Sequence, residues 1–302
     1  MNTTRANPAT RFFPVIFVLL WSTGFVGAGL SMPYAEPFTF LTLRFALAIA
    51  LLSAIAMWQG APWPDWRGAL SATLVGLLVH GVYLGGVFWA VHRGMPAGLS
   101  ALITGLQPIM TAVFAGMLLG ETVRRAQWVG LVAGLAGIDM VLAPKIAGGF
   151  AGVTAVTIFA ASCSMLGMSL GTVVQKWLGA RADLRTGAVW QFIGAGVVST
   201  ALAFTFETRV IVWAPQLLIA LAWLTIVLSI GAIFLLMFMI REGEVSRVAS
   251  LFYLVPGVTA LMTWALFDET LQPVQIAGML VTMAAVALAT YQPRRTADRA
   301  MR

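Results

Sequence analysis

Ser169 lies in a pattern that some serine hydrolases use around their nucleophile. Residues 167–171 read Gly-Met-Ser-Leu-Gly, a GxSxG motif, and His80 is the candidate general base. This reading predicts an intramembrane serine hydrolase. The nucleophile elbow needs a strand–turn–helix, however, whereas this segment lies within a long apolar run. Gly167 and Gly171 also give the small-residue face of a closely packed helix, which is the interpretation we favour.

A second group of polar residues forms a stripe along an apolar segment. Ser100, Thr104, Gln107 and Thr111 recur at helical spacing on one face. Pro108 lies within the stripe and removes the hydrogen bond to a carbonyl one turn earlier. Ordinary helix–helix contacts are one explanation of such a face. The other is a binding site for an amphipathic molecule, reached from within the membrane.

Three further residues could carry chemistry inside apolar runs. His80 and Tyr83 share a helical face, where a histidine either bonds a neighbouring carbonyl or lines a substrate path. Arg44 is the one Lys or Arg that lies well inside a predicted span, away from its ends. It could snorkel, hold helix ends together or bind a carboxylate. For Arg44 we favour the structural roles and keep carboxylate binding as the alternative.

The composition identifies the medium in which these residues lie. The chain has 302 residues, of which 60% are hydrophobic and 10% charged; the mean hydropathy is +0.92. So few charges cannot cover a water-facing surface, which indicates a polytopic membrane protein. The net charge of +7 does not indicate nucleic-acid binding, because Lys and Arg fall in short connections between apolar runs. The single Cys163 excludes an internal disulfide, and no metal, cofactor or ATP-binding motif is expected.

Ten segments are long and apolar enough to cross a bilayer as helices. We place them at 12–30, 37–58, 68–91, 96–119, 126–144, 151–178, 186–206, 215–240, 247–268 and 274–291. Of the 18 Lys and Arg residues, 14 lie on one predicted side, 3 on the other, and Arg44 within a span. Basic residues collect in the cytoplasm, so the terminal segments 1–11 and 292–302 are both predicted to be cytoplasmic.

The chain also repeats itself. The segment 105–123 reads GLQPIMTAVFAGMLLGETV, and the segment 253–271 reads YLVPGVTALMTWALFDETL, with Pro108 in register with Pro256. The two units of the repeat are predicted to be 12–144 and 151–291. Each contains five spans, an odd number, so the units enter the membrane from opposite sides. The sequence therefore predicts two inverted five-helix repeats.

The two copies differ where a site is expected. Thr104 and Gln107 of the first copy correspond to Phe252 and Val255 of the second, and Tyr253 lies beside them. One copy is polar where the other is apolar and aromatic, which suits a ligand with a polar end and a ring.

The pattern of these segments resembles the EamA-type proteins of the drug/metabolite transporter superfamily, over almost the whole chain. The landmarks are Trp21-Ser22-Thr23-Gly24-Phe25, Leu43-Arg44-Phe45 and the segment from Gly116 to Glu121. Within that superfamily the His80 and Tyr83 face is similar to the YddG-type aromatic amino acid exporters. The resemblance implies a bacterial inner-membrane exporter with a central cavity and alternating access, whose partners are a small-molecule substrate and membrane lipid.

The expected function is therefore export of aromatic, and of other bulky neutral, amino acids. Proposed substrate-binding residues, from the helical faces above, are Arg44, His80, Tyr83, Thr104, Gln107, Trp190, Phe252 and Tyr253. Pro108 and Pro256 are the predicted hinges. A broad drug/metabolite exporter and the Ser169–His80 hydrolase are the alternatives. Facilitated and proton-coupled transport both remain open at this stage, as does the oligomeric state.

Overall fold

The computed structural model consists mainly of helices. It describes residues 12–120, 122, 124–148, 152–178, 183–232, 235, 254–267 and 271–290. Six helices in this part are long and apolar enough to cross a membrane, namely Pro37–Trp58, Trp66–His92, Ala97–Leu119, Ala155–Leu178, Leu184–Phe206 and Pro215–Ala232. Shorter apolar helices cover Val15–Ser31, Trp128–Val141, Val255–Phe267 and Pro273–Leu288. The prediction of an all-helical polytopic membrane protein is confirmed, and the count of ten spans stays a prediction.

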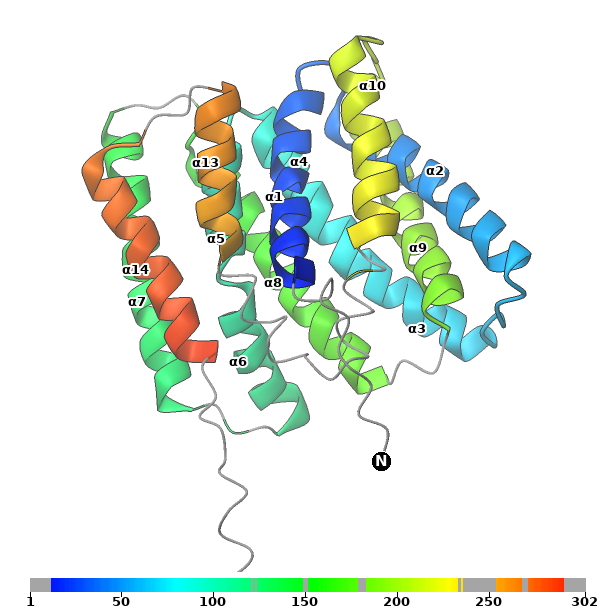
Figure 1. Cartoon of the computed structure of the whole chain (residues 1–302), viewed down its shortest axis with the longest axis horizontal. Coiled ribbons are helices and arrows are strands. Elements are labelled where there is room, and N and C mark those ends of the chain that lie inside the picture. The colour runs from blue at the N-terminus through cyan, green and yellow to red at the C-terminus, as the bar shows by residue number, and fades with distance from the viewer. Residues whose placement is uncertain are drawn as a thin grey trace, which may run out of the picture.

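The first half of the chain forms five helical stretches (Figure 1). They are α1 (Phe13–Ser31), α2 (Pro37–Trp58), the continuous α3 (Trp66–Gly76), η2 (Leu77–Val82) and α4 (Tyr83–His92), the pair α5 (Ala97–Thr104) and α6 (Gln107–Leu119), and α7 (Arg125–Ala147). The second half forms α8 (Ala155–Leu178), α9 (Leu184–Phe206), α10 (Pro215–Ala222) with η3 (Trp223–Ala232), α13 (Val255–Phe267) and α14 (Pro273–Thr290). The segments η2 and η3 are π-helical.

Local sequence explains where several helices begin. Proline opens α2 at Pro37 and α10 at Pro215, where its missing N–H costs no hydrogen bond. The Asp65 carboxylate accepts the N–H of Gly68 and caps α3. Asp183 caps α9 in the same way through the N–H of Arg185.

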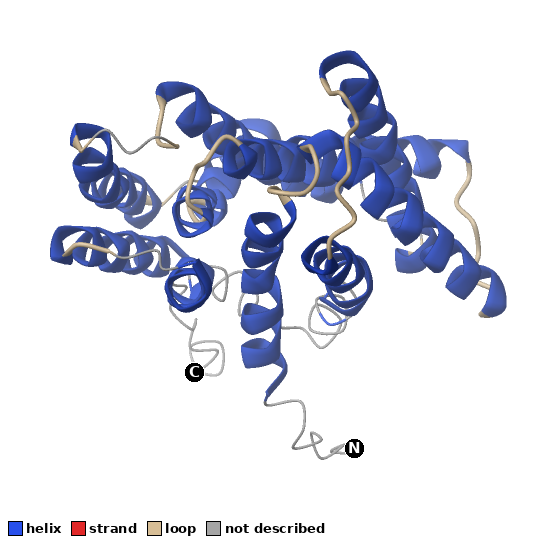
Figure 2. Ribbon diagram, turned by 90° about the horizontal axis from the view of Figure 1, so that it is seen from above, coloured by secondary structure: helices blue, strands red, loops and turns tan. Residues whose placement is uncertain are grey.

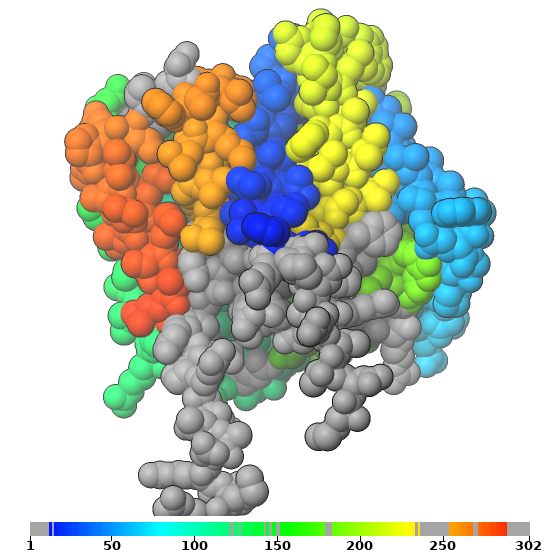
Figure 3. Space-filling model, viewed as in Figure 1, coloured from blue at the N-terminus to red at the C-terminus, as the bar shows by residue number. Residues whose placement is uncertain are grey.

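The helices pack in a pattern that the two halves share. Helix α2 packs on α9, α7 on α14, and α5 on α13. Helix α1 contacts η3 and α13, while α8, its counterpart in the predicted repeat, contacts η2 and α6. The space-filling view shows α13, α1 and α10 side by side on one face (Figure 3). In the view of Figure 1, α1 begins at its lower end and α14 finishes at its lower end. Two related halves would produce this pairing of corresponding helices. The inverted repeat itself stays a prediction.

Two apolar clusters fill the interior. One joins α1, α2, α4 and α9 and includes the fully buried Phe40, Phe45, Phe88 and Phe192. The other joins α5, α6, α7, α8 and α14 and includes Leu102, Ile109 and Val286. Seen from above, α7 and α14 lie at one side of the molecule and α2 and α9 at the other (Figure 2). The elements between these pairs, α1, α4, α5, α8 and α13, therefore occupy the centre.

Helices α7 and α14 approach closely through small residues. A methyl group added at Gly137 would overlap the Gly278 carbonyl and Thr282, and one added at Gly278 would overlap the Gly137 carbonyl. The Gln275 amide reaches across and donates to the carbonyl of Val141 at 3.0 Å. Backbones this close need glycine at the contact, as in other membrane helix pairs.

Helices α2 and α9 are joined at the end where α2 begins. The Glu207 carboxylate, just after α9, accepts the N–H groups of Phe38 and Thr39 at 2.8 and 2.7 Å. These are unpaired first-turn groups of α2, so Glu207 caps a helix of the other half. Glu36 reciprocates, because its carboxylate accepts the N–H groups of Thr208 at 3.2 Å and Arg209 at 2.6 Å.

This reciprocal contact changes the titration of Glu36. Partial burial raises the pKa of Glu36, but hydrogen bonds from residues 208–210 together outweigh it and lower the pKa below its ordinary value. An antiparallel bridge between Ala35 and Ile211 lies beside the two carboxylates. The α1–α2 and α9–α10 connections thus form one structure.

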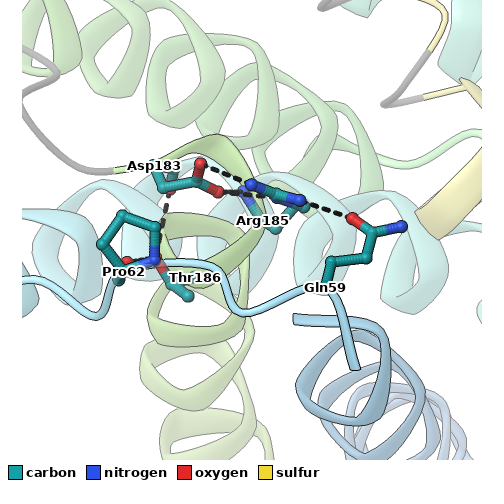
Figure 4. Close-up of polar contacts among 5 residues, drawn as sticks. All are labelled: Gln59, Pro62, Asp183, Arg185 and Thr186. Carbon is teal, nitrogen blue, oxygen red and sulfur yellow. Dashed lines mark hydrogen bonds and ion pairs between the residues drawn. The ribbon is translucent and has the colours of Figure 1, made fainter. Parts of the chain in front are cut away.

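The same two helices are also joined at their opposite end (Figure 4). Arg185 binds both oxygens of Asp183 at 2.9 Å and reaches the Gln59 side chain after α2. The Thr186 hydroxyl donates to the carbonyl of Pro62 at 2.9 Å. The hydrogen bonds to Arg185 lower the pKa of Asp183. Helices α2 and α9 are therefore linked at both ends, each link joining one half of the chain to the other.

Candidate substrate-binding site

A cavity lies in the centre of the molecule, between the two linked helix pairs. It is lined by residues of α1, α4, α5, α6, α8 and α13 and of the α5–α6 break: Trp21, Phe25, Tyr83, Ala101, Thr104, Gly105, Gln107, Met168 and Val255. Its volume is about 20 Å³, which is room for roughly one water molecule. A larger ligand would need the surrounding helices to move apart.

One wall of the cavity is aromatic. Tyr83 opens α4 and is 7% exposed, and its phenol is hydrogen-bonded to the Trp21 side chain. Trp21 packs in turn on Phe17, with ring centroids 5.4 Å apart. Phe25 lies one turn after Trp21 on α1 and completes this wall. The wall suits the face of a planar, apolar group.

Another part of the lining is polar because the fourth helical stretch is interrupted there. Helix α5 ends at Thr104 and α6 begins at Gln107, with Pro108 in its first turn. Pro108 has no N–H for the carbonyl of Thr104, so the regular α-helical hydrogen-bond ladder cannot run through this point. Gly105 permits a close approach here, since a methyl group on it would overlap the ring of Pro256 in the first turn of α13. The two predicted hinge residues thus lie near one crossing of α5 and α13.

The polar groups at this interruption are only partly used. The Thr104 hydroxyl donates to the carbonyl of Ser100 at 2.9 Å, not to the carbonyl freed by Pro108. The Gln107 amide donates to Thr111 at 2.9 Å, and within the described part of the chain no hydrogen bond reaches the Gln107 side-chain oxygen. A side-chain amide has two N–H donors and one carbonyl acceptor. Gln107 therefore retains capacity to bond a ligand in the cavity.

His80 lies in the π-helical segment η2, behind the cavity wall. Its ring stacks on Phe192 with centroids 4.5 Å apart, and Phe45 lies 6.4 Å away. It is also hydrogen-bonded to the Gln191 side chain. His80 is thus held between α2 and α9 and is not among the residues that line the cavity.

Arg44 lies in α2 at the same depth as this cluster, and it does not snorkel. Its side chain is 4% exposed and donates to the Ser229 hydroxyl of η3 at 3.2 Å. It lies close enough to Tyr83 and His80 to interact with both electrostatically. Tyr83 therefore belongs both to the cavity wall and to the surroundings of Arg44.

The predicted site residues divide into four groups. Tyr83, Thr104 and Gln107 line the cavity, while Arg44 and His80 lie behind it. Trp190 is half-buried in α9, and its indole N–H is buried without a hydrogen-bond partner. Phe252 and Tyr253 lie outside the described residues.

The cavity also contains residues that the sequence did not assign to the site. Trp21, Phe25 and Met168 were not among the predicted binding residues. A deep tryptophan with a phenylalanine one turn later was the available signal for α1. The orientation of Met168 towards the cavity depends on how α8 packs against the other helices, and the residues around Met168 do not indicate it.

Ser169 makes contacts of a packing residue. It is fully buried, and its hydroxyl donates to the carbonyls of Met165 at 2.8 Å and Gln107 at 3.1 Å. No hydrogen bond joins Ser169 to His80 in the part of the chain that the structure describes. Gly167 and Gly171 lie against η2, where added methyl groups would overlap Val82 and Val79. The GxSxG motif thus serves close helix contact.

The fold and cavity define a polytopic helical membrane protein with a central, partly polar pocket, which is the architecture of a small-molecule transporter. A family model agrees: the EamA-like transporter family matches residues 11–143 and again 155–291. The chain belongs to the EamA-like transporter family.

Individual relatives extend along almost the full chain. The chain is 29% identical over 284 residues to "Uncharacterized inner membrane transporter YedA" of Escherichia coli strain K12, covering 92% of this chain and 90% of the relative. It is 22% identical to "Probable amino-acid metabolite efflux pump" of Salmonella typhimurium, over 95% of this chain and 97% of the relative. A solved crystal structure matches with a TM-score of 0.64 at 21% identity, over 94% of this chain and 97% of that one. That likeness concerns the fold.

Proposed function

We propose that the protein is an inner-membrane secondary transporter that exports aromatic, and other bulky neutral, amino acids by alternating access. The observation that carries this is the mixed lining of the cavity. Trp21, Phe25 and Tyr83 offer aromatic surface, and Thr104 and Gln107 offer hydroxyl and amide groups. A phenylalanine-sized ligand has the same division into ring and polar end.

The energetics favour such a ligand. Burying an aromatic side chain against this wall stabilises the complex by about 1.5–3 kcal/mol. The polar wall then fixes the orientation of the amino acid, since an unbonded ammonium or amide group would be costly to bury. His80, Trp190, Phe252 and Tyr253 complete the proposed site around this core.

Two features support the transport route. The relatives include one named as an inner-membrane transporter and one named as an amino-acid metabolite efflux pump. The cavity is smaller than an amino acid in this arrangement, so ligand binding requires helices to move. We assign that movement to the interruption between α5 and α6 and to the first turn of α13, with Pro108 and Pro256 as the hinges. Cytoplasmic termini, from the distribution of Lys and Arg, complete the orientation.

The test is transport in proteoliposomes. Vesicles containing the wild-type protein should release preloaded radiolabelled phenylalanine, tyrosine and tryptophan faster than empty vesicles. Tyr83→Ala should slow this release at least about tenfold, because it removes part of the aromatic wall. Met117→Ala, on the exposed face of α6, is the matched control and should retain wild-type flux.

Two results would change the assignment. Equal release from protein-containing and empty vesicles would refute amino-acid export. Competition by a panel of cationic dyes and drugs, with none by amino acids, would favour the broad drug/metabolite exporter instead.

A further inference from the structure

Arg44 is a buried cation with few partners. Its terminal nitrogen donates to the Ser229 hydroxyl at 3.2 Å, whereas its buried Nε has no hydrogen-bond partner among the described residues. A guanidinium has five N–H donors and stays charged in proteins. Among the residues that the structure describes, the ion pair found is that between Arg185 and Asp183, far from α2's centre. The positive charge of Arg44 is thus uncompensated by a carboxylate in that part of the chain.

An uncompensated charge in such a place is expensive. Placing a charged arginine inside the membrane-spanning part of a helix is unfavourable, because the guanidinium loses its hydration. Ionisable groups retained there usually pair with another charge or mark a substrate path. The fold therefore keeps Arg44 at a cost in stability, and a purely structural link would not need the charge.

The other half of the molecule shows what a purely structural link looks like. Arg44 and Gln191 occupy corresponding positions of α2 and α9, just before the paired rings of Phe45 and Phe192. Each reaches a π-helical segment of the opposite half: Arg44 bonds Ser229 in η3, and Gln191 bonds His80 in η2. The neutral amide of Gln191 is sufficient for such a link. The link from Arg44 to Ser229 therefore does not require a charge.

The surroundings of Arg44 suit an anion. Thr225 lies four residues before Ser229, about one turn of the π-helix η3, so the two hydroxyls share a face. Thr225 is 2% exposed, and its hydroxyl has no hydrogen-bond partner in the part of the chain that the structure describes. Tyr83 connects this region with the cavity wall. A carboxylate has two oxygens in a plane and matches the fork of a guanidinium better than a spherical anion does.

We propose that Arg44, with the hydroxyls of Ser229 and Thr225, is the subsite for the carboxylate of the transported ligand. This inference rests on the proposed function and sharpens it: the substrate class is molecules in which a free carboxylate is joined to an apolar group. Amines and alcohols of the same shape are excluded from tight binding.

The test measures ligand affinity by the shift in thermal unfolding of the purified protein. The ligands are phenylalanine, 3-phenylpropionate, which lacks the ammonium group, and phenylalaninol, in which CH₂OH replaces the carboxylate. The variants are Arg44→Gln and Arg44→Lys. Arg185→Gln removes a charge from a surface pair and is the matched control.

The expected result has two parts. Wild-type protein binds phenylalanine and 3-phenylpropionate at least about 30-fold more tightly than phenylalaninol, since removing one partner of a buried charge pair has effects of this size or larger. Arg44→Gln loses this preference, Arg44→Lys retains part of it, and Arg185→Gln leaves it unchanged. Without ligand, Arg44→Gln unfolds at the same or a higher temperature than wild type, because an uncompensated charge is gone. A structural role predicts a lower temperature.

Several outcomes would overturn the inference. One is equal affinity of the wild type for phenylalanine and phenylalaninol, which needs no variant to fold. Another is unchanged phenylalanine affinity in Arg44→Gln. A third is an Arg44-dependent shift with chloride or phosphate and none with 3-phenylpropionate, which would indicate an inorganic anion site.

Failure of the proposed function gives a separate signature. If no aromatic compound binds wild-type protein, aromatic amino-acid export is refuted. An Arg44-dependent shift with the aliphatic 4-methylvalerate would then still support a carboxylate subsite. No shift with either class would refute both.

Discussion

The link between α2 and α9 predicts a disulfide that can be introduced between the two halves of the chain. Ala35 and Ile211 face each other in an antiparallel bridge, and the N–H of Val212 donates to the carbonyl of Tyr34 beside it. This makes Ala35 and Ile211 a non-hydrogen-bonded pair, whose Cα atoms lie about 4.5 Å apart. Disulfides form at Cα separations of about 4.4–6.8 Å. Cysteines at 35 and 211 should therefore bond without backbone movement.

The size of the effect follows from the loop that the bond would close. The loop runs from 35 to 211, roughly 180 residues, and its closure entropy corresponds to about 5 kcal/mol of stabilisation. The protein with the disulfide should therefore unfold at a higher temperature than the same variant after reduction. Transport should continue in both forms, because α2 and α9 are also joined near Gln59 and Thr186 and are expected to move as one body.

The assay uses a background in which Cys163, the single cysteine of the chain, is replaced by Ala. Maleimide-polyethylene glycol adds two labels to the reduced Ala35→Cys/Ile211→Cys variant and none to the oxidised one. In the proposed orientation this end faces the oxidising side of the inner membrane, so the bond should form in cells without added oxidant. Ala35→Cys/Trp213→Cys is the control, with the second cysteine two residues beyond the bridge.

Two results would refute this reasoning. Full labelling of the Ala35→Cys/Ile211→Cys variant after mild oxidation would show that the two connections do not pair. Efficient bonding that blocks transport until a reductant is added would show that α2 and α9 separate during the cycle.

Three further predictions concern stability. The low pKa of Glu36 contributes stability that is present above about pH 4.5 and is lost as pH falls through the lower folded pKa. In Glu36→Gln the unfolding temperature should therefore fall less than in the wild type between pH 6 and 3.5. The same pH profile in both proteins would contradict this prediction. Gly137→Ala should lower the free energy of unfolding by about 1–3 kcal/mol, because the added methyl group overlaps Gly278. Gly196→Ala should be tolerated, because the nearest atoms to its added methyl group are 3.8 Å away. Equal effects of the two substitutions on thermal unfolding would be inconsistent with the α7–α14 packing. Ser169→Ala should lower the free energy of unfolding by at most about 1 kcal/mol and leave transport flux unchanged. Wild-type protein should not react with a serine-directed fluorophosphonate. Labelling of the wild type together with loss of flux in Ser169→Ala would support the serine-hydrolase hypothesis instead.

Much of the fold could be predicted because apolar length is a strong signal. The predicted ranges 37–58 and 186–206 differ from α2 and α9 by two residues or fewer. Pro108 marked the interruption of the fourth stretch because a proline removes a helical hydrogen bond whatever surrounds it. The π-helical segments η2 and η3 were not predicted, since one extra residue per turn leaves no mark on an already uniform apolar run.

The site was less predictable, because the spacing of residues on a helical face does not determine which other elements that face contacts. The spacing of Thr104 and Gln107 placed them on one face, and that face borders the cavity. His80 shares a face with Tyr83 by spacing, yet the π-helical geometry and the rings of Phe45 and Phe192 hold it behind the wall. Contacts between distant segments, such as Arg44 with Ser229, have no local signal at all.

The most direct measurement is a structure of the protein determined with phenylalanine bound. We expect density for the ligand in a widened cavity between α1, α4 and α5, with the ring against Trp21 and Tyr83 and the carboxylate directed to Arg44. Density for phenylalanine elsewhere, or in this cavity with the carboxylate turned away from Arg44, would contradict it.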